Sequence, residues 1–181
     1  NARARALEGV DAVIHLAAQG SVPRSMEDPE ATMDVNVHAT DRLLDDMADR
    51  GLHRLVLASS AAVYGDVDGL PHTEDLVGAR QSPYADSKWA NEQAVQRRRE
   101  QGWEAIALRF FNVYGTGQRA DGAYAAVIPK FIEMALAGRA ATIFGDGLQT
   151  RDFVHVDDVA SAVLMLATQP WENELTHVYN V

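Results

Sequence analysis

The 181-residue sequence contains no cysteine. Disulfide bonds and thiolate metal sites are therefore excluded, and stability must come from a buried core, which a chain of this length can form. Basic residues are also scarce, because 16 Lys and Arg stand against 26 Asp and Glu and give a formal net charge of −10. A chain this acidic is poorly matched to nucleic acid or to an anionic membrane surface, so neither is expected as a partner.

Long apolar runs are missing as well. No stretch approaches the roughly 20 apolar residues that cross a bilayer, and no signal peptide is visible. The first residue is Asn1 rather than methionine, residues 1–10 look like the end of a helix, and residues 176–181 look like a strand that stops at the chain end. We therefore expect an internal piece of a longer, cytoplasmic protein.

Short apolar runs alternate along the chain with segments of helical character. Strands are predicted at 11–18, 53–60, 104–111, 141–145, 151–156 and 177–181, and helices at 28–50, from 82 to near 102, ending at 138, and at 157–168. Strands and helices that alternate with short joints favour an α/β fold, with a parallel sheet covered by helices and right-handed crossovers.

Several boundaries follow from local chemistry. The run 11–18 is predicted to be a strand buried on both faces, followed by a loop over 19–28. Asp28 is predicted as an N-cap with Pro29 at the first helical position, and Gly51 as the residue that ends that helix. Asp157 is predicted to cap the last helix.

The most informative stretch runs from Ser59 to Lys88. Tyr84 and Lys88 are four residues apart in a helical segment, so their side chains share one face. A tyrosine has an ordinary pKa of about 10, and an adjacent ammonium is expected to lower it. With a hydroxyl from Ser59 or Ser60 nearby, this group suits removal of a hydroxyl proton while a hydride leaves the same carbon. The alternative is an ordinary, partly exposed helix face, with both serines bonded to the backbone.

The order of several motifs carries a resemblance to a known family. HLAA at 15–18, NVHAT at 36–40, SSAAVYG at 59–65, YADSK at 84–88, RFFNVYG at 109–115 and RDFVHVDDVA at 151–160 occur in this sequence. Together they resemble the extended short-chain dehydrogenase/reductase family, specifically its NAD-dependent nucleotide-sugar epimerases and dehydratases. SVPRS at 21–25 and AYAAVIPKF at 123–131 are most similar to UDP-sugar 4-epimerases.

The resemblance implies a Rossmann-type, doubly wound parallel sheet with part of a small C-terminal substrate-binding region. It implies NAD as cofactor, a nucleoside-diphosphate sugar, such as a UDP-sugar, as substrate, and a homodimer. Residues 1–112 would form the dinucleotide-binding portion, 113–156 the substrate-binding segment, and 157–181 a returning helix and strand. The family's first βαβ unit, with its glycine-rich loop, is expected to precede this piece. Gly115, Gly117 and Ala120 fit G-x-G-x-x-A, but they follow the third strand, so we interpret them as a substrate-side loop.

The resemblance also implies roles for single residues. Tyr84 would be the acid and base, Lys88 would contact the nicotinamide ribose, and Ser60 would hydrogen-bond the reacting sugar oxygen. The expected cofactor contacts are Leu16, Ala17, Ala18, Asn36, Ser59, Tyr84, Lys88 and Phe110. The expected substrate contacts are Ser21, Arg24, Ser60, Asn112 and Arg151. Simple packing for Ala17 and Ala18, a core position for Phe110 and a surface salt bridge for Arg151 stay open as alternatives.

The residues after Ser60 narrow the predicted reaction. Dehydratases of the family carry acidic residues near positions 61 and 62, whereas this chain has Ala61 and Ala62. The interpretation is epimerisation at C4 through a transient 4-keto intermediate. A 4,6-dehydratase or reductase of the same family, or a non-catalytic NAD(P)-binding protein, remains the alternative. His15, His38 and His155 lack metal-ligand spacing, so no metal site is expected and they are interpreted as structural.

Overall fold

The computed structural model describes residues 2–120, 126–171 and 175–181. The first half contains α1 (Ala2–Ala6), β1 (Val13–His15), α2 (Val22–Glu27), α3 (Pro29–Met33), the π-helical turn η1 (Asp34–His38), α4 (Ala39–Ala48), β2 (Arg54–Ser60), the 3-10 turn η2 (Ala61–Tyr64) and α5 (Pro83–Glu100). The second half contains β3 (Glu104–Phe110), β4 (Asn112–Tyr114), α6 (Val127–Leu136), β5 (Phe153–His155), α7 (Val156–Thr168) and β6 (Val178–Asn180).

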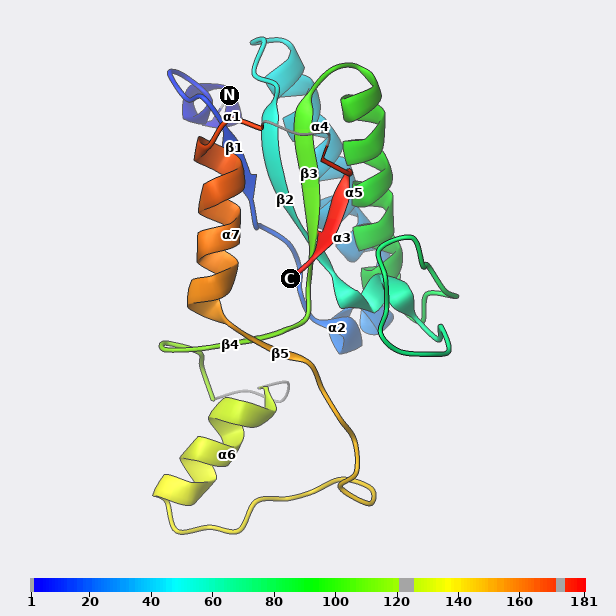
Figure 1. The fold of residues 1–181 in the computed structure, drawn as a ribbon, viewed down its shortest axis with the longest axis vertical. Helices are drawn as coiled ribbons and strands as arrows, with labels where there is room; N and C mark the ends of the chain where they lie inside the picture. The colour runs from blue at the N-terminus through cyan, green and yellow to red at the C-terminus, as the bar shows by residue number, and fades with distance from the viewer. Residues whose placement is uncertain (1, 121–125, 172–174) are drawn as a thin grey trace.

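The main sheet is parallel, with strand order β1-β2-β3-β6 (Figure 1). β2 and β3 are paired along their whole length, from Arg54 opposite Glu104 to Ser60 opposite Phe110. The carboxyl ends of the two central strands are therefore level. The predicted α/β fold with a parallel sheet is confirmed.

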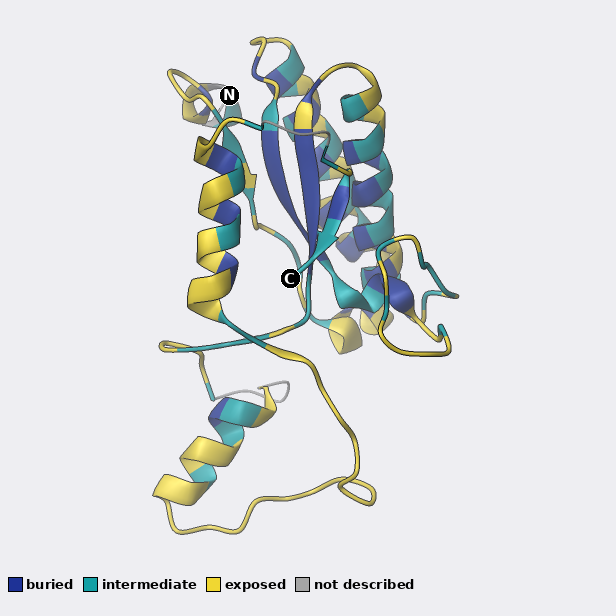
Figure 2. Cartoon of the chain, viewed as in Figure 1, coloured by how far each residue is buried: buried dark blue, intermediate teal, exposed yellow. Residues whose placement is uncertain are grey.

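Alternate residues of the central strands enter two separate cores. Leu55 and Leu57 of β2 pack on the α4 and α5 side, whereas Val56 and Ile106 pack under α7. This alternation arises because successive strand residues point to opposite faces. Figure 2 shows the two central strands as the most continuously buried part of the molecule. Helices thus cover both faces, as a doubly wound sheet requires.

β1 differs from the prediction. It is only three residues long and is not buried on both faces, because Ile14 is 43% exposed and Leu16 is 57% exposed. Within the described residues, β1 pairs with β2 alone and lies at the edge of the sheet. An apolar run identifies a strand, but it does not specify which neighbours cover that strand.

The predicted helix 28–50 is present as three consecutive segments. Asp28 caps it by accepting a hydrogen bond from the Ala31 N–H at 3.0 Å, with Pro29 at the first position as predicted. The π-helical turn η1 divides α3 from α4 and places Asn36 on the buried side. The preceding segment is not a plain loop, because Ser21 caps the short helix α2 within it. Gly51, at φ +67°, ends α4 as predicted.

The segment between β4 and β5 lies beyond the carboxyl ends of the main sheet (Figure 1). The predicted strand at 141–145 is wrong: residues 140–150 have no regular structure and are exposed. A strand needs a pairing partner, and the described chain offers this segment none. β5 forms as predicted and pairs in parallel with β4. His155, not Asp157, caps α7, since the His155 Nδ1 accepts the Asp157 N–H at 3.3 Å.

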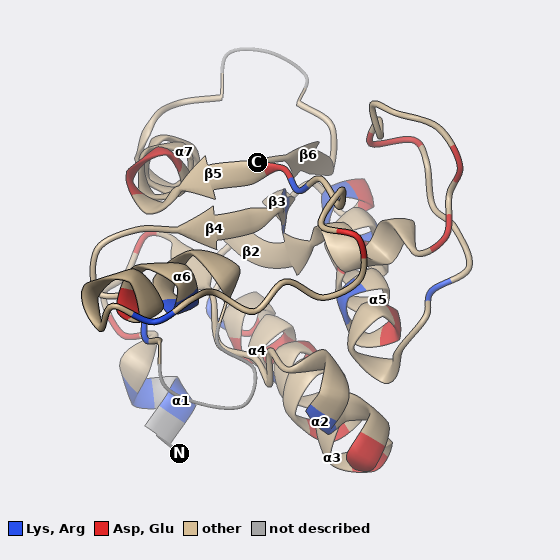
Figure 3. Ribbon diagram, turned by 90° about the horizontal axis from the view of Figure 1, so that it is seen from below, with Lys and Arg blue, Asp and Glu red and all other residues tan. Residues whose placement is uncertain are grey.

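Acidic and basic residues both occur on α4 and α5, whereas α7 carries only acidic ones. Figure 3 shows both kinds on α5 and α6, and acidic positions along the loop that joins η2 to α5. In the described part of the chain, no helix has the length and apolar character needed to cross a membrane.

Candidate active site

The candidate site lies where β2 ends and α5 begins. Ser60 is the last residue of β2, and Tyr84 and Lys88 lie on the first two turns of α5. The helix begins at this point because the Ser82 hydroxyl accepts the Ala85 N–H at 3.1 Å and Pro83 occupies the first helical position. The predicted start of this helix is confirmed, and the fold brings the three predicted catalytic residues together.

Tyr84 is half-buried, and its phenol interacts with the Ser60 side chain. Burial raises the pKa of Tyr84 above its ordinary value, while the bond to Ser60 opposes this rise by favouring the phenolate. The predicted lowering of this pKa is therefore wrong for the protein on its own. The reason is geometric, since the Lys88 ammonium lies 5.8 Å from the Tyr84 ring centroid and donates its hydrogen bond elsewhere.

Lys88 is only 4% exposed, and its Nζ donates to the Ala58 carbonyl at 2.7 Å. Burial lowers the pKa of Lys88 to about 8. His15 on β1 contacts the Thr40 hydroxyl at 2.9 Å, and both burial and the Lys88 charge lower the pKa of His15. At neutral pH, Lys88 is thus the cation of this site and His15 is neutral.

Asn36 is fully buried and joins two parts of the site. Its Oδ1 accepts the Gln19 N–H at 2.7 Å, and its Nδ2 donates to the Gln19 carbonyl at 3.1 Å and to the Ser87 hydroxyl at 2.9 Å. These bonds tie the loop after β1 to α5. The predicted cofactor contact of Asn36 stays a prediction, and in this structure its side chain is committed to these three bonds.

Ser59 is bonded to α5. Its side chain is 3% exposed and donates a hydrogen bond to the Glu92 carboxylate. Because β-strand neighbours point to opposite faces, the side chains of Ser59 and Ser60 lie on opposite faces of β2. The predicted cofactor contact of Ser59 stays a prediction, and its hydroxyl is committed to Glu92.

The loop that follows β1 is open at the carboxyl edge of the sheet. Leu16 and Ala17 are exposed and Ala18 is half-buried, which leaves a small-residue surface where open α/β sheets bind ligands. The Gln19 Nε2 is buried without a hydrogen-bond partner and is therefore an unused donor beside this surface. Ser21 caps α2, which places the exposed Arg24 on its first turn.

The remaining predicted residues follow β3 and precede β5. Phe110 lies opposite Ser60 in the sheet and packs at the edge of the α7 core. The exposed Asn112 donates to the Asp152 carbonyl at 2.7 Å, which holds it beside Arg151. Arg151 is exposed and donates only to the neighbouring Thr150 carbonyl among the bonds described for it. Phe110 combines a core contact with a position at the site, and Asn112 is partly committed to the β4–β5 pairing.

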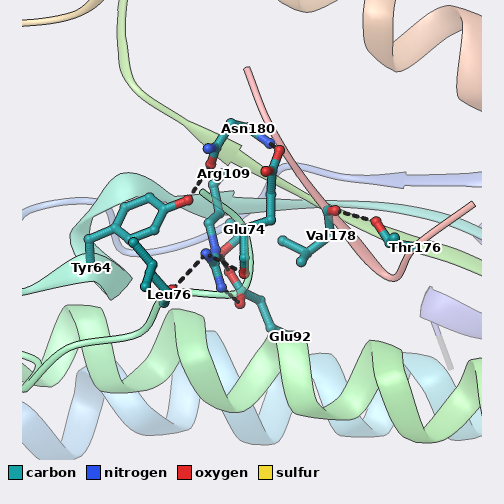
Figure 4. A network of polar contacts seen from close by, with 9 residues as sticks. Tyr64, Glu74, Leu76, Glu92, Arg109, Thr176, Val178 and Asn180 are labelled. Atoms are coloured by element: carbon teal, nitrogen blue, oxygen red, sulfur yellow. Dashed lines mark hydrogen bonds and ion pairs between the residues drawn. The ribbon is translucent and has the colours of Figure 1, made fainter. Parts of the chain in front are cut away.

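A buried ion pair behind the site was not predicted from the sequence. The Arg109 Nη2 lies 2.8 Å from the Glu92 Oε2, and the two side chains are 1% and 0% exposed (Figure 4). The signal was a charged residue at the end of the apolar run 104–111, where an isolated charge would be costly. No cluster of three or more metal-ligating side chains occurs among the residues that the structure describes.

Comparison with known proteins agrees with this geometry. The model of the NAD dependent epimerase/dehydratase family matches residues 1–181. The UDP-glucose 4-epimerase of Mycolicibacterium smegmatis is 41% identical over 154 residues, which are 84% of this chain and 49% of that protein. The dTDP-glucose 4,6-dehydratase of Streptomyces griseus is 33% identical over 178 residues, which are 98% of this chain and 52% of that protein.

Two solved structures are similar over nearly the whole chain. UDP-N-acetylglucosamine 4-epimerase from Methanobrevibacter ruminantium M1, in complex with UDP-N-acetylmuramic acid, has a TM-score of 0.92 and 36% identity, covering 100% of this chain and 57% of that one. UDP-glucuronic acid 4-epimerase from Bacillus cereus, in complex with UDP-glucuronic acid and NAD, has a TM-score of 0.85 and 31% identity, covering 99% and 56%. The chain therefore spans about half the length of these relatives.

Proposed function

This chain belongs to the NAD-dependent epimerase/dehydratase family, and from that premise we propose that the full-length protein carrying it inverts a nucleotide-sugar at C4. The observation that carries the proposal is the group formed by Ser60, Tyr84 and Lys88 at the end of β2 and the start of α5. The enzyme would be an isomerase that acts through a transient 4-keto sugar.

In this proposal the chain's own residues move the proton. Tyr84 would take the proton of the C4 hydroxyl as a phenolate, a form that the Ser60 side chain favours and that burial opposes in the protein on its own. The Lys88 ammonium lies 5.8 Å from the Tyr84 ring centroid, and its bond to the Ala58 carbonyl fixes this positive charge in place beside the site. When bound, NAD supplies the acceptor and later the donor of the C4 hydride. Tyr84 returns its proton to the sugar oxygen when the hydride returns to the opposite face.

The residues present fit such a cofactor. The exposed Leu16, Ala17 and Ala18 surface allows close approach of a ligand to the backbone, and the Gln19 Nε2 is a buried donor without a partner. Lys88 would contact the ribose and Phe110 the nicotinamide side. In these contacts Lys88 would keep its bond to the Ala58 carbonyl, and Phe110 would keep its packing at the edge of the α7 core.

The proposed substrate is a nucleoside-diphosphate sugar, for which UDP-sugars are the first choice. Arg151 and Arg24 are exposed guanidinium groups, which suit bidentate binding of a diphosphate. Ser21 and Asn112 would contribute further polar contacts. We propose residues 113–156 as the substrate-side segment, between a cofactor-binding portion over 1–112 and the returning helix and strand over 157–181.

Epimerisation is favoured over dehydration by the residues that follow Ser60. Ala61 and Ala62 are half-buried and place methyl groups where elimination would require an additional acid and base. The second candidate is a 4,6-dehydratase or reductase, which the 33% identity to a dTDP-glucose 4,6-dehydratase supports.

Product analysis separates the two candidates. The full-length protein is incubated with NAD and UDP-glucose, UDP-N-acetylglucosamine or UDP-glucuronic acid, and the nucleotide-sugars are resolved by ion-exchange chromatography and NMR. The proposal expects the C4 epimer of at least one of them, at equilibrium with the starting sugar. A stable 4-keto-6-deoxy product, or no turnover of any UDP-sugar, would refute it.

A homodimer and a cytoplasmic location complete the proposal. The helices that contain Asn36 and Tyr84 would form the contact, and they lie on the same side of the sheet. Val35, 48% exposed on the outer side of η1, would be covered in such a dimer. Analytical ultracentrifugation of the protein and of Val35→Glu tests this: the dimer should dissociate in the variant.

A further inference from the structure

We propose that Glu92 and Arg109 are positioning residues, which hold Ser60 against Tyr84 through Ser59 and through the loop that precedes α5. Neither residue is open to a ligand, since their side chains are 0% and 1% exposed. The inference rests on the proposed function, because it concerns the geometry of the same proton-transfer group.

The first link is the ion pair itself. Arg109, in β3, donates from Nε to the Glu92 Oε1 at 3.0 Å and from Nη2 to the Glu92 Oε2 at 2.8 Å. Such a two-pronged pair fixes orientation as well as distance. Burying both charges is costly, and an apolar pair of similar volume is often as stable. A contribution to stability alone therefore explains this pair poorly. The alternative is that the pair positions neighbouring residues.

The second link is the face of α5 that meets β2. Tyr84, Lys88 and Glu92 are spaced at intervals of four, so they lie on one face of the helix. Each reaches a different residue at the end of β2. The pairs are Tyr84 with the Ser60 side chain, Lys88 with the Ala58 carbonyl at 2.7 Å, and Glu92 with the Ser59 hydroxyl.

These three contacts fix the position of α5 along β2. Of these three residues, Glu92 also accepts hydrogen bonds from Arg109, which lies on the neighbouring strand β3. The carboxylate thus accepts hydrogen bonds from Ser59 on β2 and from Arg109 on β3 at once. If the Glu92 carboxylate moved, Ser59, which is bonded to it, would move as well. Ser60 would then be displaced because it is the next residue in the chain.

The third link is the loop over 65–81, which enters α5 immediately before Tyr84. The Arg109 Nη1 donates to the carbonyls of Glu74 at 3.1 Å and Leu76 at 3.2 Å, and its guanidinium lies 4.8 Å from the Tyr64 ring centroid. Figure 4 shows these groups converging from the strand, the helix and the loop. Arg109 therefore joins the loop to the same pair that holds Ser59.

Asn180, at the end of β6, bonds to the same loop and to Tyr64. Its Oδ1 accepts the Tyr64 hydroxyl at 2.6 Å, its N–H donates to the Glu74 carboxylate at 2.8 Å, and its Nδ2 donates to the His72 carbonyl at 3.0 Å. The loop is thus fastened to both β3 and β6. The polar network sets where η2 and α5 stand relative to the strand ends.

The test uses the full-length protein with the double variant Glu92→Leu/Arg109→Met, which removes both charges and leaves the net charge unchanged. Misplacement of reacting groups by about 1 Å lowers turnover by up to about 100-fold, so kcat should fall by about 10–100-fold while KM for the sugar stays within about twofold. The Tyr84 ring resonance in ¹³C-tyrosine-labelled protein, assigned with Tyr84→Phe, should also shift, because the Ser60 contact changes.

The matched control is the Arg54–Glu104 pair, which joins β2 and β3 at their amino ends with a 2.6 Å bond. The double variant Arg54→Met/Glu104→Leu should leave kcat and the Tyr84 resonance unchanged, even if its melting temperature falls. Equal behaviour of the two double variants, in kcat and in the resonance, would overturn the inference.

A milder pair of variants keeps the test decisive if the Glu92 and Arg109 double variant does not fold. Ser59→Ala removes only the hydroxyl that Glu92 holds, and Ser59→Thr restores a hydroxyl at the same position. The inference expects kcat to fall severalfold in Ser59→Ala and to recover in Ser59→Thr. Wild-type kcat and an unmoved Tyr84 resonance in Ser59→Ala would overturn it. Absence of epimerisation by the wild-type protein would instead refute the proposed function, and the resonance would still report on positioning.

Discussion

Replacing Lys88 by methionine should change the stability of the protein in a way that depends on pH. Burial lowers the pKa of Lys88 to about 8, against an ordinary value of 10.5. Since one pKa unit corresponds to about 1.4 kcal/mol, holding this ammonium inside the fold costs about 3 kcal/mol at neutral pH. Lys88→Met removes that cost. It also leaves the Ala58 carbonyl without its donor, which costs about 1–3 kcal/mol.

The sign of the pH dependence follows from proton binding. Between pH 8 and pH 10.5 the unfolded chain still holds the Lys88 proton, whereas the folded protein has released it. The wild-type free energy of unfolding therefore rises with pH across this window. Relative to Lys88→Met, the wild type should gain about 2–3 kcal/mol between pH 7 and pH 10, because the other titrating groups are shared and largely cancel.

Urea unfolding followed by the fluorescence of the three tryptophans measures this difference. Lys130→Met, on α6, serves as the control for removing a lysine charge elsewhere. A difference between Lys88→Met and wild type that stays constant from pH 7 to pH 10 would refute the argument. It would mean that the Lys88 ammonium is solvated and does not face Tyr84 from the interior.

Further stability measurements test the fold and the site. Leu57→Ala, 1% exposed in β2, should lose about 2–5 kcal/mol of unfolding free energy in urea, whereas Ile14→Ala, on β1 and 43% exposed, should lose about 1 kcal/mol or less. Equal losses would show that β1 is buried after all. Asn36→Ala should lose about 2–4 kcal/mol, because the Gln19 backbone and the Ser87 hydroxyl lose buried partners. A loss in the same urea titration below about 0.5 kcal/mol would contradict this arrangement.

The features that could be predicted from the sequence depend on neighbours in the chain. Asp28-Pro29 and Ser82-Pro83 start helices because a capping side chain bonds an N–H three residues on, which short-range sequence specifies. The apolar runs at 53–60 and 104–111 form the two central strands for a similar reason. The spacing of Tyr84 and Lys88 also predicted that the two side chains share one face of α5, since a helix converts a separation of four into a shared face.

The predictions that failed depend on burial and pairing. The run 141–145 resembles a strand, but in the described chain it finds no partner. The burial of Ser59 and Asn36, whose cofactor contacts stay predictions, also depends on packing that the sequence does not specify. The pKa of Tyr84 is raised rather than lowered, because desolvation depends on how deeply α5 packs against the sheet.

The pairing of Arg109 with Glu92 could not be predicted from the sequence for the same reason. Its members are 17 residues apart in the sequence and belong to a strand and a helix, so no local pattern connects them. Only the packing of α5 on β3 brings the two charges together. The loop carbonyls that complete the network come from still another segment.

The central claim is that the Tyr84 hydroxyl transfers the proton of the reacting sugar. Tyr84→Phe in the full-length protein removes one oxygen atom and leaves the ring in its half-buried position. General acid–base groups contribute about 10²–10⁴-fold to rate, so kcat for C4 epimerisation should fall by at least about 100-fold while the UDP-sugar still binds. Turnover within about tenfold of wild type would contradict the account.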